Sequence, residues 1–78
     1  MLSEGVVGED VRDLQAYLNR FSEKLEGFPE VAVDGIFGPQ TRDAVYTFQA
    51  AYGLPVNGLV GPVVWNEIAR VYDSLAEG

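Results

Sequence analysis

The chain has 78 residues, 47% of them hydrophobic and interleaved with turns and charges, which is the composition of one small globular domain. Twelve acidic residues against five basic ones give a net charge of −7, which argues against nucleic acid as a partner because basic side chains hold phosphate backbones. Cysteine and histidine are absent, which excludes disulfides, thiol nucleophiles, imidazole bases and the usual zinc ligands, so we expect no metal and no cofactor.

The first predicted element is a helix over residues 9–25. Its apolar residues recur at spacings of three and four, which places them along one side of a helix. Acidic residues open the segment and Lys24 lies near its end, a distribution that complements the helix dipole. The expected buried side consists of Val11, Leu14, Leu18, Phe21 and Leu25.

The next segment, residues 30–34, is predicted to be extended and to form a very short strand, because Val31 and Val33 alternate with polar or small neighbours. Helices are predicted over residues 39–52 and 62–75, each beginning at a proline, whose fixed φ suits the first helical position. The expected inward residues are Ala44, Val45, Phe48, Ala51 and Tyr52 in the second helix and Trp65, Ile68, Val71, Tyr72 and Leu75 in the third.

A turn motif is repeated before these helices. Asp34-Gly35-Ile36-Phe37-Gly38-Pro39 precedes the second helix, and Asn57-Gly58-Leu59-Val60-Gly61-Pro62 precedes the third, 23 residues later. Asp or Asn caps such a turn, Gly adopts dihedrals that other residues avoid, and the apolar pair between the glycines is expected to plug the core. A weaker copy, Gly5-Val6-Val7-Gly8, precedes the first helix. We therefore predict an all-α, compact three-helix bundle in which one turn-plus-helix unit is used three times.

Candidate ligand-binding residues lie on one flank of the second helix. At about 100° per residue, Arg42, Tyr46 and Gln49 fall together beside the buried stripe. A tyrosine between a guanidinium and a carboxamide could stack on a sugar and bond its acetamido or peptide groups. A solvated face on which one tyrosine lies is the alternative.

Two further candidates, Asp34 and Trp65, have both a structural and a functional interpretation. Asp34 is first a turn cap and second a ligand contact, and no second acid stands at the equivalent turn position, so a carboxylate pair for glycoside cleavage is not expected. Trp65 is first a packing residue and second a shelf for ligand. For Gln15 and Gln49, the favoured structural interpretation is an amide that bonds to a neighbouring glycine turn.

The pattern as a whole resembles the three-helix type of the peptidoglycan-binding domain family, over about residues 5–75. The residues that carry the resemblance are Gly8, Val11, Leu14-Gln15, Leu18, Asp34-Gly35-Ile36-Phe37-Gly38, Thr41, Ala44-Val45, Phe48-Gln49, Gly53-Leu54, Asn57-Gly58, Val60-Gly61-Pro62 and Trp65. Two positions depart from the family pattern: Asn57 stands where Asp is usual, and Val64 where Thr is common.

The resemblance implies that residues 1–78 form a single non-catalytic, bacterial or phage module that binds the glycan or stem peptide of peptidoglycan and anchors an attached cell-wall hydrolase. It also implies an extracellular or envelope location, in the cell wall or spore. The first residues lack the pattern of a signal peptide, so we expect the export signal to lie outside this chain. We expect a monomer that contacts neither membrane nor nucleic acid.

An alternative is a protein–protein or intramolecular interaction domain that packs on a partner catalytic domain. The acidic composition and the departures at Asn57 and Val64 motivate it. A small enzyme in its own right is a third, weaker interpretation.

Overall fold

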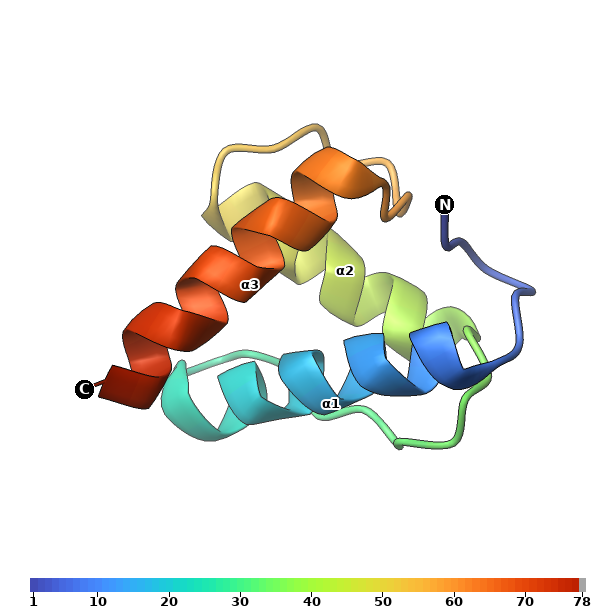
Figure 1. Cartoon of the computed structure of the whole chain (residues 1–78), viewed down its shortest axis with the longest axis horizontal. Coiled ribbons are helices and arrows are strands. Elements are labelled where there is room, and N and C mark those ends of the chain that lie inside the picture. The colour runs from blue at the N-terminus through green and yellow to red at the C-terminus, as the bar shows by residue number, and fades with distance from the viewer. Residues whose placement is uncertain (78) are drawn as a thin grey trace.

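The computed structural model describes residues 1–77, which form three helices: α1 (Glu9–Lys24), α2 (Pro39–Ala51) and α3 (Pro62–Glu77). The predicted all-α class is confirmed, and each observed helix begins at its predicted residue. Figure 1 shows the helices arranged around a common centre, with the last turn of α3 near the end of α1. None of the helices in this part of the chain has the length and apolar character needed to cross a membrane.

The core is formed by the inward sides of the three helices together with residues of the connecting loops. Phe21 of α1 stacks on Phe48 of α2, with ring centroids 5.4 Å apart, and packs edge-on against Phe28 of the following loop. Most predicted inward residues are buried. Ala51 is exposed, because the buried side of α2 is turned toward Gln49 and leaves Ala51 at its edge.

The predicted strand at residues 30–34 is wrong. Residues 1–77 contain only two isolated antiparallel bridges, Leu2 with Val60 and Val7 with Ile36. Both join the N-terminal segment to the turns that precede α2 and α3. Each turn is thus paired with the N-terminal segment and not with residues 30–34. The Val31 side chain is buried in the core.

The two complete turn motifs, called here the first elbow (residues 34–39) and the second elbow (residues 57–62), have closely similar backbones. Gly35 has φ 78° and Gly58 has φ 75°, in the left-handed region that side-chain-bearing residues avoid. In each elbow one member of the apolar pair is buried and the other exposed. Side chains that follow one another in extended backbone point to opposite sides, so the expectation that both plug the core is wrong. Phe37 and Val60 are buried, whereas Ile36 is 52% and Leu59 40% exposed.

Candidate functional site

The first elbow is held by the side chain of Gln15, which projects from α1. Its carbonyl oxygen accepts the backbone N–H groups of Asp34 (3.0 Å) and Gly35 (2.8 Å). Its amide nitrogen donates to Asp34 Oδ1 (2.9 Å) and to the carbonyl of Ile36 (2.9 Å), and lies 3.0 Å from Thr41 Oγ1. Gln15 is buried, so the predicted structural role of this amide is confirmed.

Gln49 of α2 holds the second elbow in the same way. Its carbonyl oxygen accepts the N–H groups of Asn57 (3.1 Å) and Gly58 (3.0 Å), and its amide donates to Asn57 Oδ1 (3.0 Å) and the Leu59 carbonyl (3.2 Å). Two donors and two acceptor positions are the full capacity of a carboxamide. The predicted structural role of the Gln49 amide is therefore confirmed, as it is for Gln15. Because Gln49 is also 0% exposed, the alternative that places it with Arg42 and Tyr46 on a ligand-binding flank is wrong. The second elbow covers this side of α2, and its backbone and cap occupy the hydrogen-bonding groups of the Gln49 amide.

Asp34 is the cap of the first elbow. Its Oδ1 accepts the backbone N–H of Ile36 at 3.0 Å, which confirms the turn-cap interpretation. This hydrogen bond and the one from Gln15 lower the pKa of the Asp34 carboxyl from its ordinary value, and the Arg12 charge adds to the effect. At neutral pH Asp34 therefore presents a negative charge that is already bonded on one oxygen.

The structure brings Arg42 and Tyr46 together, as the helical spacing predicts. The Arg42 guanidinium carbon lies 5.7 Å from the centroid of the Tyr46 ring, within the range of a cation–π contact. The two side chains line a hollow of about 180 Å³ beside the second elbow. The other lining residues are Ser3, Glu4, Asn57, Gly58 and Leu59.

The charge of Arg42 is shared with two acids. The guanidinium lies 3.1 Å from Asp43 and 3.2 Å from Glu4, and the Asp43 hydrogen bond is the main cause that raises the Arg42 pKa. The guanidinium therefore keeps its charge while the hollow as a whole is not basic. Because two acids offset the charge of Arg42, the hollow offers an anion little net attraction.

Trp65 lies apart from this hollow, between α1 and α3. Its ring is partly buried against the core and meets Tyr17 edge-on, with centroids 6.0 Å apart. It lines none of the hollows described here. The structure therefore separates the five predicted residues into the Arg42–Tyr46 pair, the cap of the first elbow (Asp34), the α2 glutamine that holds the second elbow (Gln49) and one packing residue (Trp65).

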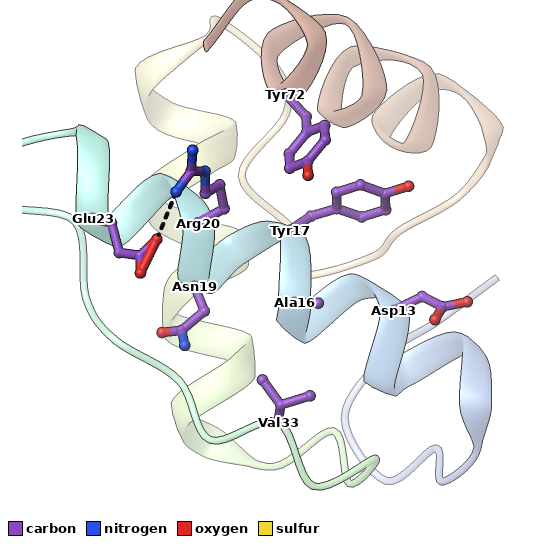
Figure 2. A pocket seen from close by; sticks show the side chains of 8 residues that line it. All are labelled: Asp13, Ala16, Tyr17, Asn19, Arg20, Glu23, Val33 and Tyr72. Atoms are coloured by element: carbon purple, nitrogen blue, oxygen red, sulfur yellow. Dashed lines mark hydrogen bonds and ion pairs between the residues drawn. The ribbon is translucent and has the colours of Figure 1, made fainter. Parts of the chain in front are cut away.

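A larger hollow of about 480 Å³ lies across the outer side of α1 and was not predicted (Figure 2). It combines six residues of α1 with Val33 of the loop between α1 and α2 and with Tyr72 of α3. The sequence feature that could have indicated this hollow is Ala16, a small residue that lies among polar residues at helical spacing on α1. The lining residues are Asp13, Ala16, Tyr17, Asn19, Arg20, Glu23, Val33 and Tyr72.

A third hollow, of about 310 Å³ and mainly apolar, lies on the other side of the second elbow. Exposed apolar groups from the N-terminus, the loop after α2 and the start of α3 meet there. Its lining residues are Met1, Gln49, Leu54, Pro55, Asn57, Leu59, Gly61, Pro62, Val63 and Val64. The second elbow thus stands between a polar and an apolar hollow.

Comparison with known proteins gives one family and several relatives. The model of the family described as "Putative peptidoglycan binding domain" matches residues 7–68. The zinc D-Ala-D-Ala carboxypeptidase of Streptomyces albus G is 43% identical over 76 residues, which cover 92% of this chain and 27% of that protein. A spore cortex-lytic enzyme of Bacillus cereus is 44% identical over 61 residues, covering 78% of this chain and 22% of that enzyme.

Solved structures share the fold. The crystal structure of the SleB N-terminal domain matches with a TM-score of 0.77 and 38% identity, covering 91% of this chain and 90% of that one. The chain spans about a quarter of the length of the curated relatives named above. The part of each relative that matches is therefore one module of a longer protein.

Proposed function

The chain belongs to the peptidoglycan-binding domain family, and from this premise we propose that it is a non-catalytic module that holds an attached cell-wall hydrolase on murein. The single observation that carries the proposal is the family match, which includes both elbows and both clamping glutamines. The relatives named above are a carboxypeptidase and a spore cortex-lytic enzyme. The proposal has further parts. The attached enzyme acts on peptidoglycan, the protein lies in the cell or spore envelope, an export signal lies outside this chain, and the module is a monomer.

We place ligand binding at the hollow beside the second elbow, with Arg42 and Tyr46 as the contacting side chains. Tyr46 is 36% exposed and offers an aromatic surface, while Arg42 offers hydrogen-bond donors held beside it. The hollow is small and open, which supports a modest affinity. A polymeric wall presents many equivalent units, and repeated rebinding raises retention without a tight single site.

Sedimentation with purified sacculi tests the proposal. The folded chain should be retained, and retention should increase with salt because both the chain and the wall polymers are acidic. Absence of retention at every salt concentration, with the helical circular dichroism intact, would refute the module's role.

A matched pair of variants tests the location. Arg42→Ala should weaken retention, whereas Arg70→Ala, which removes the same charge from an exposed site on α3 paired with Glu67, should not. Tyr46→Leu should weaken retention while keeping apolar bulk. Equal effects of the two arginine variants would contradict the location of the binding site beside the second elbow.

A second candidate function is docking onto an attached catalytic domain. The apolar hollow beside Leu59 and Val63 favours it, because exposed apolar groups gathered in one place are typical of contact surfaces. Titration of the isolated catalytic domain into the labelled chain should then shift the amide signals of residues 54–64. Shifts caused only by soluble wall fragments would leave this candidate without support.

A further inference from the structure

The large hollow on α1 has the geometry of a short groove (Figure 2). Ala16 lies between two walls: the rings of Tyr17 and Tyr72 on the side of α3, and Val33 on the side of the loop that leads to α2. Because Ala16 carries only a methyl group, the surface of the helix is open at this point. A volume of about 480 Å³ is within the range of small-ligand sites.

The aromatic wall is fixed by its packing. Tyr17 meets Tyr72 edge-on at 4.9 Å between centroids, and on its other side meets Trp65 at 6.0 Å. All three residues are partly buried against the core, so their rings are held in place before any ligand arrives. Val33, which is 45% exposed, supplies an apolar surface opposite them. A sugar ring, which has apolar C–H faces, suits two such walls.

Polar groups lie at both ends of the groove. Asp13 stands at one end, and Asn19, Arg20 and Glu23 stand at the other (Figure 2). Arg20 pairs with Glu23 at 3.1 Å, and among residues 1–77 Asp13 has no ion-pair partner. Two carboxylates against one guanidinium leave an excess negative charge, which repels anions. Carboxylate oxygens accept hydrogen bonds from hydroxyl groups, so the groove suits an uncharged, hydroxyl-rich ligand.

We propose that this groove binds uncharged N-acetylhexosamine units of a glycan strand, as a second contact separate from the second elbow. The inference rests on the proposed function, because it assigns the glycan part of the wall polymer to one surface. The acidic stem peptide is disfavoured by the charge of the groove. The groove and the Arg42–Tyr46 hollow share no lining residue, so a ligand in one does not block the other. Two weak contacts on one module raise retention through effective concentration.

Titration with a soluble tetramer of β-1,4-linked N-acetylglucosamine, followed by amide NMR, tests the ligand class. The tetramer has the acetamido sugars and no peptide. It should shift the signals of Ala16, Asn19, Arg20 and Tyr72, and a free stem tetrapeptide should not. Shifts from the tetrapeptide at these residues, or no shift from the tetramer, would overturn the inference.

A groove-filling variant tests the location without removing a packing contact. Ala16 is exposed on α1, and Gln is a good helix former, so Ala16→Gln should fold normally while its side chain fills the floor. Ala50→Gln, at an exposed site on α2 outside the hollows, is the control. Ala16→Gln should weaken tetramer binding about tenfold, a change of about 1.4 kcal/mol, and Ala50→Gln should leave it unchanged. Equal binding by the two variants would overturn the inference.

Sedimentation with sacculi separates this inference from the proposed function. If the unmodified chain is retained and Ala16→Gln is retained equally, the groove is not a glycan contact while the module still binds murein. If the unmodified chain is not retained at any salt concentration, the proposed function fails, and the glycan groove fails with it.

Discussion

The two elbows use one arrangement with different capping residues. Asp34 caps the first and Asn57 the second, and each side chain accepts the N–H group two residues later at 3.0 Å. A buried glutamine holds each turn, and the glycine after the cap has nearly the same φ in both. The capping charge differs while the backbone does not. The glutamine and the glycine therefore set the shape, and the choice between carboxylate and amide is free for another role.

The surroundings of the elbows differ more than the turns themselves. The N-terminal segment covers the first elbow: Gly8 donates to the Gly35 carbonyl at 2.9 Å, and a Cβ on Gly35 would lie 3.3 Å from the Gly8 carbonyl oxygen. At the second elbow, a Cβ on Gly58 would instead lie 3.0 Å from the Tyr46 ring. The first elbow is thus closed by backbone, and the second is bordered by a partly exposed aromatic side chain beside a hollow.

The largest expected effect comes from replacing the glutamine clamps. Gln15→Leu and Gln49→Leu keep apolar volume but leave buried backbone groups of Gly35 or Gly58 without partners, at about 1–3 kcal/mol for each unsatisfied group. We expect each variant to lose roughly 3 kcal/mol or more of unfolding free energy in urea titrations. Gln15→Leu should lose more, because it also removes the contact with Thr41. Negligible losses would show that the elbows do not depend on the amides, and equal losses would contradict the extra contribution of the Thr41 contact.

The next effect separates the elbows by what their glycines face. Gly35→Ala and Gly58→Ala should each cost about 1–2 kcal/mol, because both have positive φ. Gly58→Ala should also displace the Tyr46 ring and so reduce murein retention. In Gly35→Ala the new Cβ contacts the Gly8 backbone and not Tyr46, so murein retention should be unchanged after correction for the folded fraction. Denaturation curves and sacculus sedimentation measure the two effects, and a retention loss confined to Gly35→Ala would reverse the assignment.

The sequence predicted the helices well, because their information is local. The signals lie between neighbouring residues: two of the helices begin at a proline that follows a glycine, and apolar residues recur at helical spacing. The roles of Gln15 and Asp34 in the first elbow also followed, since an amide, a glycine turn and a capping side chain have few ways to combine.

What the sequence could not give depends on contacts between distant segments. The bond of the Gln49 amide to a glycine turn was predicted, but its complete burial was not, because that burial arises from the second elbow folding back over α2. The groove on α1 exists because Tyr72 comes from α3 and Val33 from a loop. Helical periodicity describes one helix at a time, so it could not predict that Tyr72 and Val33 lie beside α1.

Acid should affect the first elbow more than the second. Folding lowers the pKa of Asp34 from its ordinary value of 3.8, so its contribution to stability is present above that value and is lost as the pH falls through the lower pKa of the folded chain. Asn57 does not titrate. Asp34→Asn should therefore flatten the acid limb of a stability-versus-pH curve, leaving the part contributed by Glu67, whose pKa is lowered by Arg70. An unchanged acid limb would contradict a folded-state role for the Asp34 charge.

The smallest effect is expected from making the caps alike. In Asn57→Asp, a carboxylate oxygen can still accept from the Gln49 amide and from the Leu59 N–H, so unfolding free energy at neutral pH should change by less than about 0.5 kcal/mol. The added charge stands beside the Arg42–Tyr46 hollow. Murein retention should consequently fall at low salt and recover at high salt, where repulsion from acidic wall polymers is screened. A large loss of stability would show instead that the amide has a structural role that the carboxylate of the first elbow does not reproduce.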